Sequence, residues 1–370
     1  MTEVLAAPPD SPVVSRRRSF GLPPASVRGP ARLLLTSVTV LVLASLITFT
    51  LGALSKNNPA AVVLGETATP EDIARLNHEF GLDRPLVVQY LSWVWNALHG
   101  DLGQSWFTTV PVAQSIRLAF PVDLSIALYA LLLALVIGFG AGIAAAARPG
   151  GVVDRVVTVL CSVLATMPPF VIGIALIVLL AVKIRLFPAG GYSPYAVDPV
   201  QWLRYATLPA LALGLEVAAN IARQLRTTLV TAQAENYAIG ARMRGYGRAR
   251  VLFGHVLRNA VAPTLAVVTN ALPLIIGGAV ITEKLFNLPG VAQLALQSAQ
   301  RGDVPVVLGT LMVTSAVVLL GTLILGALQL LLDPAARRGA AARNTDNRQS
   351  RSWSSVRPGA GVPQNAGVRR

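Results

Sequence analysis

The chain has 370 residues, of which 54% are hydrophobic and only 13% are charged. Because about a quarter of the residues in a soluble domain carry charge, this composition excludes an ordinary water-soluble fold. The 31 Lys and Arg against 17 Asp and Glu give a formal charge of +14, but a mean hydropathy of +0.60 argues against a nucleic-acid partner. The single cysteine, Cys161, excludes an intramolecular disulfide.

The basic N-terminal segment, residues 1–32, contains Arg17-Arg18-Ser19-Phe20 ahead of an apolar run. This pattern is typical of a twin-arginine export signal, and the remainder would be soluble if that signal were cleaved. Five further hydrophobic segments argue against a soluble remainder. We therefore expect the basic residues to hold the start of the first membrane helix in the cytoplasm.

Long stretches with few charged residues follow, most of them reaching the roughly 20 residues that a membrane-spanning helix needs. They predict an all-α polytopic membrane protein with six transmembrane helices. The expected spans are residues 33–55, 124–147, 156–182, 205–222, 259–282 and 304–332. Gly138 and Gly142 in the second span have the GxxxG spacing that permits close helix approach, although chance explains this spacing equally well.

The spans divide the chain into five parts. The expected parts are a cytoplasmic segment 1–32, a first helix 33–55, an external loop 56–120, a five-helix core 121–332 and a disordered cytoplasmic tail 333–370. Of the 31 Lys and Arg, 22 fall in 1–32, 148–155, 223–258 and 333–370. The positive-inside rule therefore predicts a multi-pass membrane protein with both termini in the cytoplasm.

The external loop contains two helix signals. Thr69-Pro70-Glu71-Asp72 predicts a helix N-terminus, and this helix should run to Phe80 and stop at Gly81. From Pro85 onward the apolar residues have the spacing of an amphipathic helix. Its stripe is Leu86, Val87, Tyr90, Leu91, Val94, Trp95 and Leu98. The stripe either lies on the membrane or packs across the bundle, with contact to a docking partner as a third interpretation.

The cytoplasmic loop 223–262 predicts a helix, glycine, helix hairpin. Asn236 should cap a helix over Tyr237–Arg244, Gly245 should end it in a left-handed turn, and a second helix should run from Arg248 towards Asn259. The arginines of this loop suit three roles. They satisfy the topology rule, bind anionic lipid headgroups, or form a specific protein dock.

Glu216 is the ionisable residue deepest in a predicted span, and charge in lipid is costly. We expect Glu216, Asn220 and Asn270 to line a translocation pathway, with Glu216 facing the bundle interior. The alternative is that Glu216 lies near a helix end or makes an interhelical hydrogen bond. Asp123, Glu283 and Asp303 fall at span ends, where their charges should be exposed and of little consequence. Pro168-Pro169 should kink the third span, or act as its hinge.

The sequence argues against catalysis by this chain. Its three lysines, Lys56, Lys183 and Lys284, do not follow a glycine, so no GxxxxGK[ST] phosphate loop exists. Three separated histidines and one cysteine make a zinc site improbable. We therefore expect no catalytic residues, no metal site and no bound cofactor.

Five ordered motifs, spread over about residues 30–336, carry a family resemblance. They are TPEDIARLNHEFGLDRPLVVQYL, GDLGQS, MPPFVIG, NYAIGARMRGYGRARVLFGHVLRNAVAP and EKLFNLPGVAQL. Together they resemble the permease subunits of ATP-binding-cassette (ABC) importers, in the branch for oligopeptides, dipeptides and nickel. In the family a Glu-Ala-Ala triplet precedes the loop glycine by three residues. Here Ile239-Gly240-Ala241 precedes Gly245 and the acid is absent; Pro263 also lies further from the glycine than in sugar importers, and both departures resemble the peptide branch.

The resemblance implies a type I ABC importer permease of a prokaryotic inner membrane that moves oligopeptides or dipeptides into the cytoplasm. Its implied partners are a second homologous permease, two ATPases that hold ATP and Mg²⁺, an extracytoplasmic solute-binding protein and the lipid bilayer. The implied ATPase-coupling residues are Tyr237, Ala238, Ala241, Arg242, Arg244, Gly245 and Tyr246. The small residues among them, Ala238, Ala241 and Gly245, would sit in a cleft of the ATPase. A nickel permease, an ion-driven secondary transporter and an intramembrane enzyme remain the alternatives, although no inverted repeat or catalytic set favours the last two.

Overall fold

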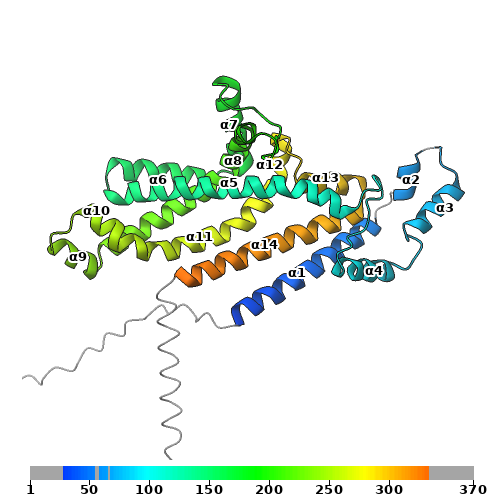
Figure 1. The fold of residues 1–370 in the computed structure, drawn as a ribbon, viewed down its shortest axis with the longest axis horizontal. Coiled ribbons are helices and arrows are strands. Elements are labelled where there is room, and N and C mark those ends of the chain that lie inside the picture. Colours follow the sequence, from blue (N-terminus) through cyan, green and yellow to red (C-terminus); the bar gives the residue numbers. More distant parts are fainter. Residues whose placement is uncertain (1–27, 55–57, 66, 333–370) are drawn as a thin grey trace, which may run out of the picture. The chain divides into compact units, whose positions relative to one another are not determined.

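The fold is seen in a computed structural model, in which residues 28–54, 58–65 and 67–332 are described. Within these ranges the chain forms helices and no β-strand, which confirms the all-α fold class. Most of the predicted N-terminal segment and the whole predicted tail lie outside the described residues. Figure 1 shows the arrangement of the helices.

Fourteen α-helices and two π-helical segments follow one another along the described chain. They are α1 (Arg28–Ala53), α2 (Pro59–Leu64), α3 (Pro70–Glu79), α4 (Leu86–Leu98), α5 (Val112–Ala147), α6 (Val152–Leu164), α7 (Pro169–Leu176), η1 (Ile177–Lys183), α8 (Pro199–Gln233), α9 (Asn236–Met243), α10 (Arg248–Val251), η2 (Leu252–Val256), α11 (Leu257–Gly277), α12 (Ala279–Phe286), α13 (Val291–Arg301) and α14 (Val304–Leu332).

Four of these helices, α1, α5, α8 and α14, are long and apolar enough to cross a membrane. Two bent pairs also qualify by length and composition: α6 with α7 and η1, and α11 with α12. If each pair forms one span, the described residues hold six spans, in agreement with the expected number.

The third predicted span, 156–182, is not one helix. The chain bends by 110° between α6 and the segment formed by α7 and η1, and in Figure 1 α7 stands away from the line of α5 and α6. Pro168 and Pro169 lack the N–H groups that would continue the helix, and a proline also disfavours helical backbone in the residue before it. The expected kink is therefore a complete break.

Two other spans are longer than predicted. The helix α5 begins at Val112 rather than near residue 124, and α8 covers 199–233 rather than 205–222. The start of α8 is fixed by Asp198, whose carboxylate accepts hydrogen bonds from Val200 N at 2.9 Å and Gln201 N at 3.0 Å. The first part of the predicted loop 223–262 is thus a continuation of α8.

The core is centred on α8, which packs against α5 along much of its length. A Cβ atom added to Gly138 would lie 2.8 Å from the Ala218 carbonyl oxygen, and one added to Gly214 would lie 2.7 Å from that of Ala130. At Gly142 the corresponding distance to Ala222 O is 3.0 Å. The GxxxG spacing therefore does mark a close helix contact, because side chains larger than glycine would force the helices apart.

An ion pair ties α6 to α8. Arg226 donates to the two carboxylate oxygens of Asp154 at 2.5 Å and 2.8 Å, and Gly150 N donates to the same carboxylate at 2.8 Å. Asp154 is only 3% exposed. A buried carboxylate needs such partners, because an unpaired charge away from water is strongly unfavourable.

The two helices predicted in the external loop are present. Thr69 Oγ1 accepts a hydrogen bond from Asp72 N at 3.2 Å at the start of α3, and Gly81 has a φ of +70° just beyond its end. In α4 Tyr90 contacts α1, since its hydroxyl lies 2.8 Å from Ser45 Oγ and its ring packs on Phe49. Trp95 is exposed. One part of the stripe therefore packs on the bundle and another part faces outward.

Candidate functional site

A groove of about 490 Å³, lined by both polar and apolar side chains, lies between α8 and α11, and we call it the α8–α11 groove. Its lining residues are Val217, Asn220, Arg223, Gln224, Thr227, Val267, Asn270, Ala271 and Leu274. The fold thus brings together Asn220 and Asn270, two of the three residues expected to line a pathway. Glu216 does not line the groove.

Glu216 nevertheless lies on the same side of α8 as the groove, because residues at positions i, i+4 and i+7 share one helix face. It is half-buried, and no hydrogen bond of its carboxylate is recorded within the described part of the chain. The opposite side of α8 carries the buried residues Ala218, Ile221 and Leu225. Buried residues also flank Glu216 on the helix surface, among them Ala212 and Ala219, so its expected orientation towards the bundle interior stays a prediction.

The groove side of α8 is unsuited to lipid. Arg223 Nη2 donates to Asn220 Oδ1 at 2.7 Å, and Gln224 Nε2 donates to Thr228 Oγ1 at 3.3 Å. Charged and amide side chains in a membrane span usually face protein or a water-filled cavity. This face is therefore available for a second subunit, for a polar substrate, or for both.

The loop that follows α8 differs from its prediction in how its helix begins. Helix α9 is preceded by Glu235, and Asn236 is its first residue rather than its cap, with no side-chain capping hydrogen bond. Gly245 has a φ of +83°, the left-handed conformation expected at this turn. The second helix of the predicted hairpin is not a separate element, since α10, η2 and α11 follow one another without a break.

Two of the expected coupling residues, Ala238 and Ala241, are buried in their own chain, with exposures of 0% and 2%. They pack in a cluster with Leu225, Leu229 and Val256. The prediction that these small side chains face a partner is therefore wrong, because the chain's own helices fill the space beside them. Small residues permit close approach on whichever side a neighbour lies.

The outward side of the same loop is formed by other residues. Met243 is 85% exposed, and Tyr237, Ile239 and Tyr246 are also exposed. The three arginines with described side chains make local contacts: Arg242 to Gln233 Oε1 at 3.4 Å, Arg244 to Gly240 O at 3.2 Å, and Arg250 to the Tyr246 ring at 5.5 Å. We call Tyr237, Ile239, Met243, Arg244 and Tyr246 the loop surface; Met243 and Ile239 were absent from the expected coupling set.

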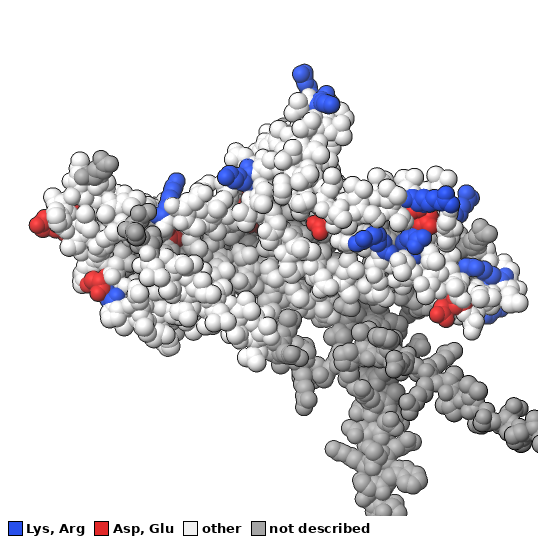
Figure 2. Space-filling view, turned by 180° about the vertical axis from the view of Figure 1, so that it is seen from behind, with Lys and Arg blue, Asp and Glu red and all other residues white. Residues whose placement is uncertain are grey.

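Basic side chains are concentrated at the end of the helix bundle where α9 and α10 lie. In Figure 2 blue groups lie over the region of α9 and α10, at the right of the view, and much of the remaining surface on that face is uncharged. This distribution is what the positive-inside rule requires if the loop is cytoplasmic.

Sequence reasoning missed a site at the start of α13, where the half-buried carboxylate of Asp123 and the buried carboxylate of Glu283 lie beside Gly290. We call Asp123, Glu283 and Gly290 the α13 anchor. Asp123 Oδ2 accepts from Val291 N at 2.9 Å, and Glu283 Oε2 accepts from Gln293 N at 2.7 Å. Glu283 is 2% exposed, so the expectation of an exposed, inconsequential charge is wrong. The first N–H groups of a helix lack acceptors within the helix. Here the carboxylates of Asp123, from α5, and of Glu283, from the preceding helix α12, accept their hydrogen bonds.

Comparison with known proteins identifies the family. Residues 138–338 match the family described as "Binding-protein-dependent transport system inner membrane component", and residues 28–127 match the N-terminal family of such membrane components. The chain belongs to this family. It is a transport permease subunit with several apolar helices in an inner membrane, built on the type I ABC importer permease architecture.

Named relatives share most of the permease. A putative peptide transport system permease protein of Brucella abortus is 35% identical over 276 residues, covering 75% of this chain and 88% of the relative. The oligopeptide transport system permease protein AppB of Bacillus subtilis is 29% identical over 303 residues, covering 81% and 96%. The dipeptide transport system permease protein DppB of Escherichia coli is 30% identical over 317 residues, covering 79% and 94%.

Asp303 of this permease is also buried, contrary to expectation. Ser105 Oγ donates to Asp303 Oδ2 at 2.5 Å, and Trp106 N donates to Oδ1 at 3.2 Å. Burial raises the pKa of Asp303 above its ordinary value, although these hydrogen bonds oppose the rise. The contact joins the GDLGQS segment to the turn between α13 and α14, which lie about 200 residues further along the chain.

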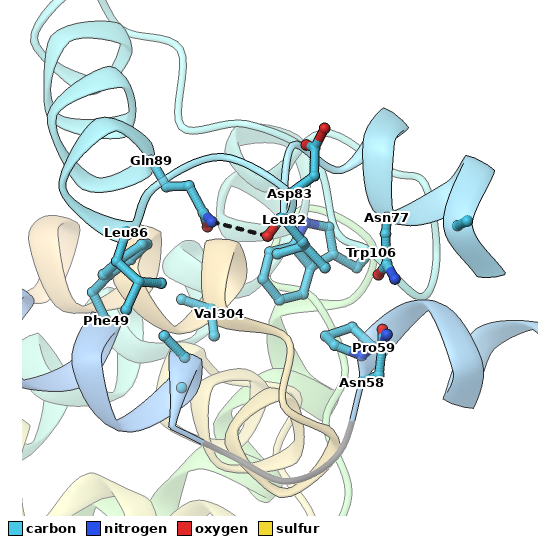
Figure 3. A pocket seen from close by; sticks show the side chains of 13 residues that line it. Phe49, Asn58, Pro59, Asn77, Leu82, Asp83, Leu86, Gln89, Trp106 and Val304 are labelled. Carbon is cyan, nitrogen blue, oxygen red and sulfur yellow. Dashed lines mark hydrogen bonds between the residues drawn. The ribbon is translucent and has the colours of Figure 1, made fainter.

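A second cavity of the permease, of about 410 Å³, lies among α1, α2, α3, α4 and the start of α14. Figure 3 shows Asn58, Asn77, Gln89 and Trp106 around it, with Gln89 Nε2 donating to Leu82 O at 3.3 Å. Asn77 Oδ1 is buried and has no hydrogen-bond partner. At the rim, His78 lies 2.7 Å from Asp83 and lowers the pKa of that carboxyl.

Proposed function

We propose that this permease moves peptides, oligopeptides or dipeptides, into the cytoplasm as the membrane subunit of an ABC importer. The observation that carries the proposal is its similarity, over three quarters or more of the chain, to permeases named for peptide, oligopeptide and dipeptide transport. The polar residues that line the α8–α11 groove, among them Asn220, Arg223 and Asn270, support it. Those names do not favour the nickel alternative.

The proposed ABC importer contains further subunits besides this permease. A second homologous permease would close the pathway beside α8, a solute-binding protein would deliver the peptide outside, and two ATPases would bind ATP with Mg²⁺ and supply the energy. This chain would then contribute no catalytic residue and bind no cofactor itself. Closure of the ATPases would pull on the loop after α8 and so shift the membrane helices, since a ligand that favours one conformation moves a two-state equilibrium.

Peptide uptake tests the proposal. Cells that lack this chain should lose uptake of a labelled tripeptide and regain it when the gene is returned, whereas uptake of ⁶³Ni²⁺ should be equal in both strains. Loss of nickel uptake with intact peptide uptake would transfer the function to the alternative substrate.

The loop surface is the proposed ATPase dock, and it yields a prediction. Met243→Glu should reduce co-purification of the ATPase about tenfold or more, because an exposed apolar side chain at a dock would be replaced by a charge that has to be desolvated. Val197→Glu, an equally exposed apolar site between η1 and α8, is the matched control and should leave co-purification unchanged. If the Met243→Glu variant co-purifies with the ATPase as well as the wild type does, the loop surface is not the ATPase-binding site.

Both termini are proposed to be cytoplasmic, on the distribution of Lys and Arg. Reporter fusions after Lys56 and after Gly302 should give an external signal, and a fusion after Gly245 should give a cytoplasmic one. A cytoplasmic signal at residue 56 would reverse the orientation.

A further inference from the structure

The α8–α11 groove has one charged lining residue, Arg223, among neutral polar and apolar side chains. Its guanidinium group is exposed and donates to the neutral Asn220 at 2.7 Å. A guanidinium has five N–H donors, so this bond orients the group and leaves donors for a ligand. The groove is therefore a cationic site with amide neighbours.

Arg226, a second arginine of α8, differs from Arg223 because it has a structural role. Arg226 makes a two-pronged ion pair with the buried Asp154 and so holds α6 against α8. No acid is recorded within ion-pair distance of Arg223 in the described residues. An accessible guanidinium without an acidic partner is best matched by a carboxylate, which it binds through two parallel hydrogen bonds.

Glu216 supplies the opposite charge at a defined distance. It precedes Arg223 by seven residues, close to two helical turns, so both lie on the groove side of α8 at an axial separation of about 10 Å. An extended peptide covers about 3.3–3.6 Å per residue, so a tripeptide covers about the same distance between its charged ends.

We propose that Arg223 binds the terminal carboxylate of a short peptide in the groove, and that Glu216 faces the terminal ammonium group of the same peptide. This inference rests on the proposed function, because it states how a peptide would be held. Asn220 is a positioning residue, since it fixes the guanidinium without adding charge. The site selects peptides by their two free ends and by the spacing between them, and it leaves side-chain selection to other residues.

The test uses the assembled transporter, with both permeases and both ATPases but without the solute-binding protein, so that only membrane-subunit preferences are measured. The probe is labelled Ala-Ala-Ala, displaced by unlabelled Ala-Ala-Ala, by its C-terminal amide or by its N-acetyl derivative. The wild type should prefer the free peptide over either blocked form about tenfold, as expected for one lost hydrogen bond to a charged group.

The variants separate the two ends. Arg223→Gln should abolish the preference over the amide and keep the preference over the N-acetyl peptide, whereas Glu216→Gln should do the reverse. Arg204→Gln, at an exposed arginine of α8 outside the groove, should keep both preferences. This control also shows that loss of an arginine from α8 does not by itself alter binding.

Three outcomes would overturn the inference. They are a wild type without preference for free ends, an Arg223→Gln variant that still discriminates against the amide, and no tripeptide binding at millimolar concentration. An Arg223 that only anchors the helix at the membrane surface would give the second outcome. If cells take up tripeptides through this permease in any of these cases, the proposed function stands and only the groove assignment fails.

Discussion

Replacing Gly290 with alanine should strongly reduce the amount of folded, active permease. The added Cβ atom would lie 2.2 Å from Asp123 Oδ1 and 2.4 Å from Glu283 Oε2, so the carboxylates would have to leave the N-terminus of α13. Overpacking of a core costs about 1–3 kcal/mol, and each lost hydrogen bond to a charged group about 1.5–3 kcal/mol. The melting temperature in detergent should fall by about 5 °C or more.

Gly140→Ala is the matched control for this prediction. Gly140 lies in α5, and a Cβ atom added there would meet nothing within 4 Å. Because alanine favours helix more than glycine does, this control should melt at or slightly above the wild-type temperature. A Gly290→Ala variant that is as stable as Gly140→Ala and transports at the wild-type rate would show that the α13 anchor tolerates displacement.

The α13 anchor also shows what sequence reasoning could not reach. Asp123 and Glu283 were expected to be exposed, because they lie at the ends of apolar runs and such ends normally contact water. Hydropathy along the sequence does not show which distant segments cover them in the fold. Asp123 meets the start of α13 across 168 positions of sequence. The Pro289-Gly290 pair does indicate a turn before a helix, and the first N–H groups of a helix need acceptors, but only the fold shows that Asp123 is one of these acceptors.

Local signals were more dependable. The cap at Thr69 and the left-handed turn at Gly245 depend on neighbouring residues, and both are present. Ala238 and Ala241 failed for a physical reason: a small side chain shows that something packs closely, without showing whether the neighbour belongs to the same chain. The break at Pro168 was larger than expected, because two successive prolines remove two donors from the helix.

The groove is an intermediate case. Polar residues in an apolar span indicate a functional face, and Asn220 and Asn270 do meet there. The predicted set of pathway residues did not include Arg223. This arginine directly follows the predicted span 205–222, where basic residues were attributed to the positive-inside rule. The longer α8 places this arginine within the helix and within the groove.

The second large effect is expected at the ion pair between α6 and α8. Arg226→Gln should destabilise the permease by about 3–5 kcal/mol, because it leaves the buried carboxylate of Asp154 without its cationic partner. Asp154→Asn should cost less, since the Arg226 side chain is 32% exposed and can turn its charge towards water. Thermal unfolding of the purified permease, measured in one detergent for all variants, gives this order.

The double variant Arg226→Gln/Asp154→Asn separates charge from packing. If the buried, unpaired carboxylate causes the loss, removing it should restore part of the stability, and the double variant should melt above Arg226→Gln alone. Arg204→Gln, at an exposed arginine of the same helix, should melt at the wild-type temperature. A double variant that melts below Arg226→Gln would contradict the charge argument. It would show instead that the Asp154 carboxylate stabilises the permease through its other hydrogen bonds, such as the one from Gly150 N, even without its cationic partner.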